Sequence, residues 1–259
     1  MGIVNVTPDS FSDGGRYLDP DIAIAHARLL REQGADILDI GGESTRPGAE
    51  RVAPRVELQR VLPVVEALAS EGALLSIDTM NATTAAAAVE AGARLVNDVS
   101  GGLADPEMLA AVANTDADIA LGHWRGPSAQ MYARADYADV TRDVIAELTE
   151  RAEAAIEAGI APSRIVLDPG IGFGKRGAQN WQTLNALPAI AALGFRVLVG
   201  TSRKRFLGDV LGDDADLARR DLATAVTSAL SARAGAWAVR VHDVPTTRDA
   251  LAVARAWGA

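Results

Sequence analysis

The chain has 259 residues, of which 49% are apolar and 23% charged, an ordinary composition for one globular domain with a sizeable core. Its formal net charge of −9 argues against non-specific nucleic-acid binding, which needs a basic surface, but not against a small anionic ligand held by local cations. Cysteine is absent, which excludes disulfides and thiolate chemistry. We expect a cytoplasmic protein, because the sequence contains neither a signal peptide nor a long apolar segment.

Eight short apolar segments have the pattern of buried strands. Five of them follow a glycine by one or two residues, and glycine at that place is typical of the left-handed residue that ends a helix. The predicted strands cover residues 2–6, 36–40, 74–78, 94–98, 118–123, 164–168, 196–200 and 237–242.

Helical patterns separate these strands. They cover residues 20–33, 55–71, 81–91, 105–114, 138–158, 178–193, 221–234 and 245–257. Eight strands alternating with eight helices over about 250 residues predict an α/β protein with a (β/α)8 barrel, also called a TIM barrel. An open doubly wound sheet is the alternative. No linker or low-complexity segment divides the chain, so we expect a single domain over residues 1–259.

Such barrels carry their site at the carboxyl ends of the strands. Polar side chains gather at these ends in this sequence, namely Asn5, Glu43, Asp78, Asn97, His123, Asp168, Ser202, Lys204, Arg240 and His242. Arg240 and His242 are two residues apart on a strand and therefore share one face. Two long segments rich in Gly, Ser and Pro, residues 7–15 and 41–48, are predicted to be loops that close over a substrate.

Eight motifs lie in order along these strand ends and loops. They are Met1–Gly15, Gly41–Gly48, Ser76–Thr79, Val96–Val99, Leu167–Gly170, Gly172–Lys175, Ser202–Lys204 and Arg240–Asp243. Together they resemble the motifs of the dihydropteroate synthase family over essentially the whole chain. Eight ordered motifs are far more specific than one glycine-rich loop. The fifth strand ends in Leu121-Gly-His-Trp-Arg-Gly126 where the family often has Met-His-Met, and this form resembles actinobacterial members.

The resemblance implies a barrel, usually dimeric, that joins 6-hydroxymethyl-7,8-dihydropterin pyrophosphate to p-aminobenzoate. The products are 7,8-dihydropteroate and pyrophosphate, in a step of folate biosynthesis where sulfonamides compete with p-aminobenzoate. We expect an SN1-like path, because the dihydropterin ring can delocalise the positive charge that develops. The expected partners are these small molecules, Mg²⁺ carried on the pyrophosphate and a second copy of the chain, with neither nucleic acid nor a membrane.

The resemblance assigns the pterin pocket to residues of several strand ends. A buried carboxylate can accept two parallel hydrogen bonds from the guanidine-like edge of a pterin, as it does from arginine. The substrate-binding residues implied here are Asp78, Asn97, Asp168, Phe173, Gly200 and Lys204. A turn or helix-cap role is the alternative for the three acidic and amide side chains, and a core position is the alternative for Phe173.

The remaining implied roles concern pyrophosphate, magnesium and p-aminobenzoate. Arg240 and His242 would bind the pyrophosphate, and Asn5 would touch its magnesium ion. The p-aminobenzoate pocket would be framed by Phe11, Thr45, Arg46 and Pro47, with Ser202 and Lys204 near the carboxylate. The residues implied in catalysis are Asp13, Lys204, Arg240 and His242. The alternatives are a structural pair for Arg240 and His242, a strand-ending role for Asn5 and ordinary surface for the loop residues.

Three other residues are predicted to lie outside direct contact with substrate. Asp98 is expected to be structural, His123 to lie behind the site, and His26 to face solvent. Two further readings of the whole chain stay open. One is a catalytically inactive paralogue that keeps the pterin pocket, and the other is a pterin-dependent methyltransferase that shares the fold.

Overall fold

The computed structural model describes residues 1–7, 20–43, 51–127, 131–212 and 214–258. Its strands are parallel and pair in chain order from β1 to β8. They are β1 (Gly2–Asn5), β2 (Leu38–Gly41), β3 (Leu75–Asp78), β4 (Leu95–Asp98), β5 (Asp118–Gly122), β6 (Ile165–Asp168), β7 (Arg196–Val199) and β8 (Ala238–Val239). The sheet closes because Ile3 N donates to Val241 O and Val241 N donates to Met1 O, both at 3.0 Å. The predicted (β/α)8 barrel is therefore confirmed, and the open sheet is excluded.

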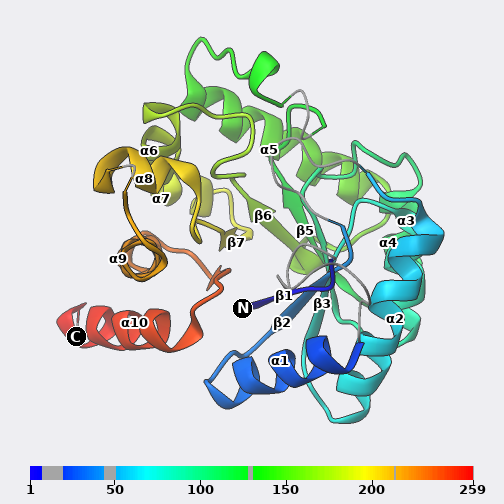
Figure 1. Ribbon diagram of the computed structural model, residues 1–259. Helices are drawn as coiled ribbons and strands as arrows, with labels where there is room; N and C mark the ends of the chain where they lie inside the picture. Colours follow the sequence, from blue (N-terminus) through cyan, green and yellow to red (C-terminus); the bar gives the residue numbers. More distant parts are fainter. Residues whose placement is uncertain (8–19, 44–50, 128–130, 213, 259) are drawn as a thin grey trace.

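Helices surround the strands on all sides of the barrel (Figure 1). They are α1 (Pro20–Glu32), α2 (Pro54–Ser70), α3 (Ala82–Glu90), α4 (Met108–Ala113), α5 (Val140–Glu157), α6 (Ala178–Asn185), α7 (Leu187–Ala191), α8 (Arg205–Leu211), α9 (Leu217–Arg233) and α10 (Val244–Gly258). Two 3₁₀ turns, Met131–Arg134 and Pro162–Arg164, lie before α5 and β6. None of the helices within the described ranges is long and apolar enough to cross a membrane.

The predicted helix over 178–193 is wrong as a single element. The structure divides it into α6 and α7 at Ala186, because Pro188 lies in the first turn of α7, where its missing N–H is tolerated but the preceding helix cannot continue. The helix predicted over 221–234 begins earlier, at Leu217. There the side chain of Asp216 accepts from Arg219 N at 2.8 Å and caps the helix.

The glycines predicted to end helices do adopt the left-handed conformation. Their φ angles are +97°, +73°, +121°, +88° and +99° at Gly34, Gly72, Gly92, Gly194 and Gly235. Each lets the chain leave a helix and enter the next strand two to four residues later.

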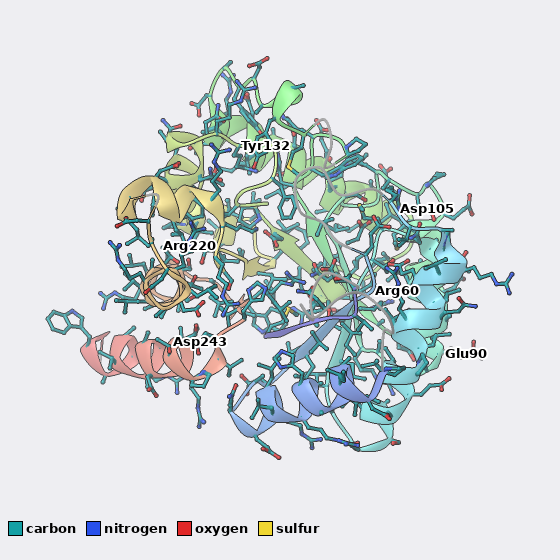
Figure 2. All side chains as sticks on the ribbon, in the orientation of Figure 1. Arg60, Glu90, Asp105, Tyr132, Arg220 and Asp243 are labelled. Carbon is teal, nitrogen blue, oxygen red and sulfur yellow. The ribbon has the colours of Figure 1, made fainter. Side chains whose placement is uncertain are left out.

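The interior of the barrel changes from apolar to polar along the strands. A cluster of buried apolar residues fills the half near the amino ends, namely Met1, Ile37, Leu95, Ala120, Val166 and Leu198. Residues two further along a strand share the same face, so Asp39, Asn97 and Asp168 follow Ile37, Leu95 and Val166 inside the barrel. The larger core lies between strands and helices, where Figure 2 shows side chains filling the space.

Candidate active site

A cavity of about 1460 Å³ opens at the carboxyl ends of the strands. Every predicted site residue within the described ranges lines it, namely Asn5, Asp78, Asn97, Asp168, Phe173, Gly200, Ser202, Lys204, Arg240 and His242. The other predicted site residues, Phe11, Asp13, Thr45, Arg46 and Pro47, lie outside the described residues. Strands far apart in the sequence thus bring carboxylates, amides and cations to one mouth.

Arg240 is held inside this cavity by two carboxylates. Its Nε donates to Asp39 Oδ2 at 2.5 Å, and its Nη2 donates to Asp78 Oδ2 at 2.7 Å. These carboxylates, Asp39 first, hold the pKa of the guanidinium above its usual range although burial acts in the opposite direction. Arg240 therefore remains a cation where the cavity can offer it to an anion.

Asp78 closes β3 and carries no helix-capping role. The amino end of α3 is instead capped by Asp105, whose Oδ2 accepts from Ala82 N at 2.8 Å. Burial raises the pKa of Asp78 to about 7, although the Arg240 cation opposes this shift. The carboxyl group thus titrates near neutral pH, which is characteristic of a functional pocket.

Asp168 and Asn97 supply further polar groups to the same wall. Asp168 Oδ1 accepts from Gly170 N at 2.7 Å, so the turn role foreseen as an alternative occupies one oxygen and leaves the other. Burial raises the pKa of Asp168, against the opposing effect of Lys204. Asn97 makes no turn contact through its amide; its Nδ2 donates to Asp39 Oδ2 at 3.0 Å.

Lys204 lies between Asp168 and the ring of Phe173. Its Nζ is 4.4 Å from the ring centroid and donates to Ile171 O. Burial lowers the pKa of Lys204 to about 8, while Asp168 acts in the opposite direction. Phe173 lines the cavity and contacts this cation, so it does not occupy the core position foreseen as an alternative.

The backbone at Ser202–Lys204 is turned by an unusual conformation. Arg203 has a φ of +58°, which non-glycine residues rarely adopt. Its guanidinium pairs with Asp221 of α9 through Nε at 2.7 Å and Nη2 at 2.8 Å. The middle residue of the motif is thus fastened to α9, while Ser202 and Lys204 both line the cavity. Ser202 Oγ lies 2.9 Å from Nδ1 of His242, which joins this motif to the end of β8.

A buried chain of polar groups lies behind Asp168. Lys175 is 1% exposed, and its Nζ lies 2.9 Å from His123 Nδ1 and donates to Gly170 O at 3.0 Å. His123 Nε2 in turn lies 2.9 Å from Glu147 Oε2. A lysine donates to Nδ1 only when that nitrogen is unprotonated, so the contact with Lys175 fits a neutral imidazole that carries its proton on Nε2. Burial and the Lys175 cation lower the pKa of His123 to about 4.

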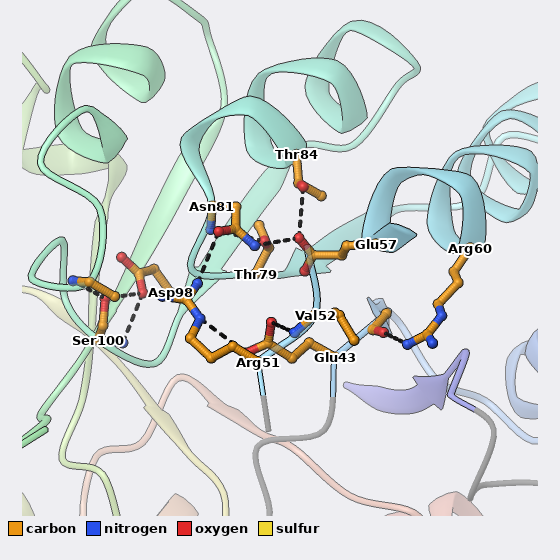
Figure 3. Close-up of polar contacts among 12 residues, drawn as sticks. Glu43, Arg51, Val52, Glu57, Arg60, Thr79, Asn81, Thr84, Asp98 and Ser100 are labelled. Carbon is orange, nitrogen blue, oxygen red and sulfur yellow. Dashed lines mark hydrogen bonds and ion pairs between the residues drawn. The ribbon is translucent and has the colours of Figure 1, made fainter. Parts of the chain in front are cut away.

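A second polar network holds the two ends of the loop whose middle, residues 44–50, is outside the described residues (Figure 3). Glu43 Oε2 accepts from Val52 N at 3.2 Å, and Glu43 Oε1 lies 3.4 Å from Nε of Arg51. Arg51 Nη2 donates to Asn81 Oδ1 at 2.9 Å. The amide of Asn81 donates to the fully buried Glu57 at 2.7 Å. The carboxyl end of β2 is therefore tied to α2 and to the start of α3.

The predictions for the three outlying residues have different outcomes. Asp98 is structural, since it accepts from Ser100 N at 2.8 Å and from Gly102 N at 2.7 Å. His123 lies behind the site, as expected. The prediction for His26 is wrong, because this side chain is half-buried against β1 and burial lowers its pKa. The helical pattern favours exposure at this position, but β1 lies beneath the side chain.

Two buried residues near the site carry no role in the sequence analysis. Asp39 lies in the middle of β2, where a strand that reads as apolar gives little sign of a functional carboxylate. Lys175 lies within the Gly172–Lys175 motif, but nothing in the motif tells that its ammonium turns inward. The alternation of side chains along a strand could have identified Asp39. Residues two apart share a face, so Asp39 shares the face of Ile37 and Gly41 and points into the barrel.

Comparison with known proteins gives a consistent result. The pterin binding enzyme family matches residues 1–242. The dihydropteroate synthase of Mycobacterium leprae is 52% identical over 99% of this chain and 92% of its own length. The dihydropteroate synthase of Xanthomonas albilineans, solved with 4-aminobenzoic acid, has a TM-score of 0.92 at 46% identity and covers 100% of this chain and 92% of its own.

The same Xanthomonas albilineans enzyme, solved in complex with 7,8-dihydropteroate, has a TM-score of 0.88 at 44% identity, over 100% of this chain and 92% of its own. Fold and sequence therefore agree over the length of the chain. This chain belongs to the pterin binding enzyme family.

Proposed function

We infer that this chain is a dihydropteroate synthase, which condenses 6-hydroxymethyl-7,8-dihydropterin pyrophosphate with p-aminobenzoate to give 7,8-dihydropteroate and pyrophosphate. The observation that carries this inference is the composition of the cavity at the carboxyl ends of the strands. Carboxylate and amide groups at the ends of β3, β4 and β6 line this cavity together with the cations Lys204 and Arg240. The relatives named above carry the same activity in their names, and two of their structures hold a substrate and the product.

The pterin half of the substrate suits the acceptor wall. Asp168 has one oxygen beyond its turn contact to accept from the guanidine-like edge, and Asp78 can accept from a ring N–H. Asn97 can offer its carbonyl oxygen, since its amide nitrogen is used on Asp39. Lys204 is the donor for the pterin carbonyl or ring nitrogen. Gly200 has no side chain, which leaves space in the cavity beside Lys204. Phe173 offers an apolar surface to the pterin ring.

The pyrophosphate half suits the cationic end. Arg240 and His242 would bind the departing anion and stabilise its charge as the carbon–oxygen bond breaks. Magnesium is treated as part of the substrate, because it commonly binds through substrate phosphates and one or two protein oxygens. Asn5 at the end of β1 offers one such oxygen. Within the described part of the chain, no three His, Asp or Glu side chains group closely enough to hold a metal by themselves.

The order of bond breaking and bond formation follows from the electronic structure of the dihydropterin ring. The electron-rich dihydropterin delocalises the positive charge on the exocyclic carbon, so pyrophosphate leaves before the aryl amine attacks. No side-chain nucleophile is required. Phe11, Thr45, Arg46 and Pro47 are proposed to frame p-aminobenzoate, with Ser202 and Lys204 near its carboxylate and Asp13 near the reacting centre. Sulfonamides would occupy the same place. Closure of the two loops would keep water from trapping the cation.

We also propose that the protein is cytoplasmic and that it forms a homodimer through α9 and α10. These two helices pack together, and both carry large apolar side chains that face outward. On α9, Leu222, Val226 and Leu230 recur at every fourth residue with exposures of 59%, 49% and 60%, and on α10 Trp257 is 82% exposed. Such a cluster favours association. Light scattering should give twice the chain mass, and Val226→Glu should give the monomer.

The deciding experiment for the reaction measures pyrophosphate release from the dihydropterin pyrophosphate with Mg²⁺, with and without p-aminobenzoate. Release that depends on p-aminobenzoate, with dihydropteroate formed in equal amount, is the expected result. Pterin binding without turnover would instead identify a catalytically inactive paralogue. Absence of pterin binding would contradict the assignment of the pocket.

A further inference from the structure

Asp39 is a buried carboxylate in the middle of β2, where its side chain points into the barrel. It is 0% exposed and pairs in register with Ile3 of β1 and Ser76 of β3. A carboxylate taken from water into such a place is costly unless it is paired and hydrogen-bonded. Its partners therefore explain why a charged residue occupies this strand.

One oxygen of Asp39 receives both of its contacts. Oδ2 accepts from Nε of Arg240 at 2.5 Å and from Nδ2 of Asn97 at 3.0 Å. Both partners lie later in the sequence, Arg240 by 201 residues and Asn97 by 58 residues. One of them belongs to the proposed pyrophosphate side of the cavity and the other to the proposed pterin side.

These contacts decide which atoms remain for a ligand. Arg240 donates through Nε to Asp39 and through Nη2 to Asp78. Its third nitrogen, Nη1, donates to neither of these carboxylates. Asn97 uses its amide nitrogen on Asp39, which leaves its carbonyl oxygen as an acceptor. The second oxygen of Asp39, Oδ1, is buried without a hydrogen-bond partner among the described residues. The carboxylate is therefore committed to these two side chains.

We propose that Asp39 is a positioning residue that orients Arg240 toward pyrophosphate and Asn97 toward the pterin. It thereby links the two halves of the same substrate through one oxygen atom. The inference rests on the proposed function, because it takes the roles of Arg240 and Asn97 from there.

If Asp39 positions Arg240, removing its carboxylate should change pyrophosphate affinity in the direction opposite to that expected from charge repulsion alone. A buried negative charge near the cavity repels pyrophosphate by itself, so removing it should tighten binding. If Asp39 acts by orienting Arg240, removing it should weaken binding instead. Asparagine matches the size of aspartate and can still place one oxygen near the two donors, but it lacks the negative charge that holds the guanidinium. Its NH₂ group would also take the place of Oδ1, where the described residues offer no hydrogen-bond partner.

The test measures dissociation constants by calorimetry for inorganic pyrophosphate with Mg²⁺ and for 6-hydroxymethylpterin. Asp39→Asn should weaken pyrophosphate binding about tenfold or more and should weaken pterin binding as well. Asp98→Asn is the matched control, because Asp98 is equally buried but contacts Ser100 and Gly102 instead of Arg240. Both ligands should bind to this control as they do to the unchanged protein.

A double-mutant cycle separates orientation from general damage to the fold. In an Arg240→Ala background, Asp39→Asn should leave pyrophosphate affinity unchanged or improve it, because only the repulsive charge is then removed. Equal weakening in both backgrounds would show a merely structural role and overturn the proposal. Should Asp39→Asn not fold, Arg240→Lys keeps the cation without Nε. Wild-type affinity of that variant would equally overturn it.

The proposed function and this inference fail in different ways. If the unchanged protein binds neither pyrophosphate nor the pterin, the proposed function is wrong and the inference is overturned with it. If the unchanged protein binds both and Asp39→Asn binds them equally well, only the inference is wrong.

Discussion

Gly172 lies directly against the side chain of Lys204, so that a Cβ at residue 172 would be 2.8 Å from Cδ of the lysine. The backbone at Gly172 also has a φ of +83°, which side chains rarely allow. The close approach fixes where the Lys204 ammonium can lie. The glycine is therefore required by the lysine as well as by the turn.

Gly172→Ala should displace Lys204 and weaken pterin binding. Misplacing a group by about 1 Å can cost roughly a hundredfold in rate, so we expect kcat/KM to fall by up to that order and pterin affinity to fall with it. Gly72→Ala is the control, since Gly72 has a similar φ of +73° but nothing within 4 Å of its added Cβ. Both substitutions should lower the free energy of unfolding by about 1–2 kcal/mol. Equal pterin affinities in the two variants would contradict the role of Lys204.

Asp168→Ala should weaken pterin binding more than any change at the amino ends of the strands. Removing one partner of a desolvated, hydrogen-bonded charge pair costs about 2–5 kcal/mol in binding. Asp118→Ala provides the comparison, because Asp118 begins β5 at the other end of the barrel and pairs with Arg196 at 2.9 Å. Fluorescence titration with 6-hydroxymethylpterin measures both. A pterin affinity unchanged in Asp168→Ala would refute the assignment of this carboxylate.

The pterin affinity should fall as the pH drops through about 7. Burial raises the pKa of Asp78 to about 7, and the carboxylate must be ionised to accept a hydrogen bond from a ring N–H. Below that pH, the proton has to be lost on binding, which costs about tenfold in affinity per pH unit. Titrations from pH 5.5 to pH 8.5 would show the break.

Asp78→Asn should bind the pterin more weakly and without this break near pH 7. Arg240→Ala should move the break to higher pH, because the cation that opposes the shift is removed. A pterin affinity of the unchanged protein that stays constant over the same range would rule out Asp78 as the ionised acceptor.

The sequence predicted the barrel well because its signals are local and repeated. A glycine that ends a helix, followed by an apolar strand and a polar strand end, occurs often enough to identify the fold. The strand-end residues that line the cavity, such as Asp78 and Asp168, followed from that arrangement alone. The roles assigned to them stay predictions until the experiments above are made.

The features that the sequence did not predict depend on contacts between distant strands. Asp39 became important only when β8 placed Arg240 beside it, across 201 residues of sequence. Lys175 was quoted within a motif, yet its burial depends on His123, which lies 52 residues earlier. The helix break before Pro188 has a local cause, because proline ends the preceding helix, whereas the apolar periodicity alone favours one continuous helix.

The stability of the protein should fall as the pH drops from about 6.5 toward 4, in part because of His123. Burial, together with the nearby Lys175 cation, lowers the pKa of this imidazole to about 4, so the unfolded chain binds a proton that the folded protein does not. The contribution is complete above pH 6.5, the ordinary value, and is lost progressively down to pH 4. A shift of this size corresponds to at most about 3 kcal/mol.

His123→Gln should be less stable than the unchanged protein at neutral pH, because the contacts to Lys175 and Glu147 are altered. It should nevertheless lose less stability between pH 6.5 and pH 4, since glutamine does not titrate. Urea unfolding across this range measures both slopes. His26→Gln is the control, because His26 is only half-buried and its pKa is also lowered by burial. A larger change in slope for His26→Gln than for His123→Gln would mean that the buried chain through Lys175 does not keep His123 neutral.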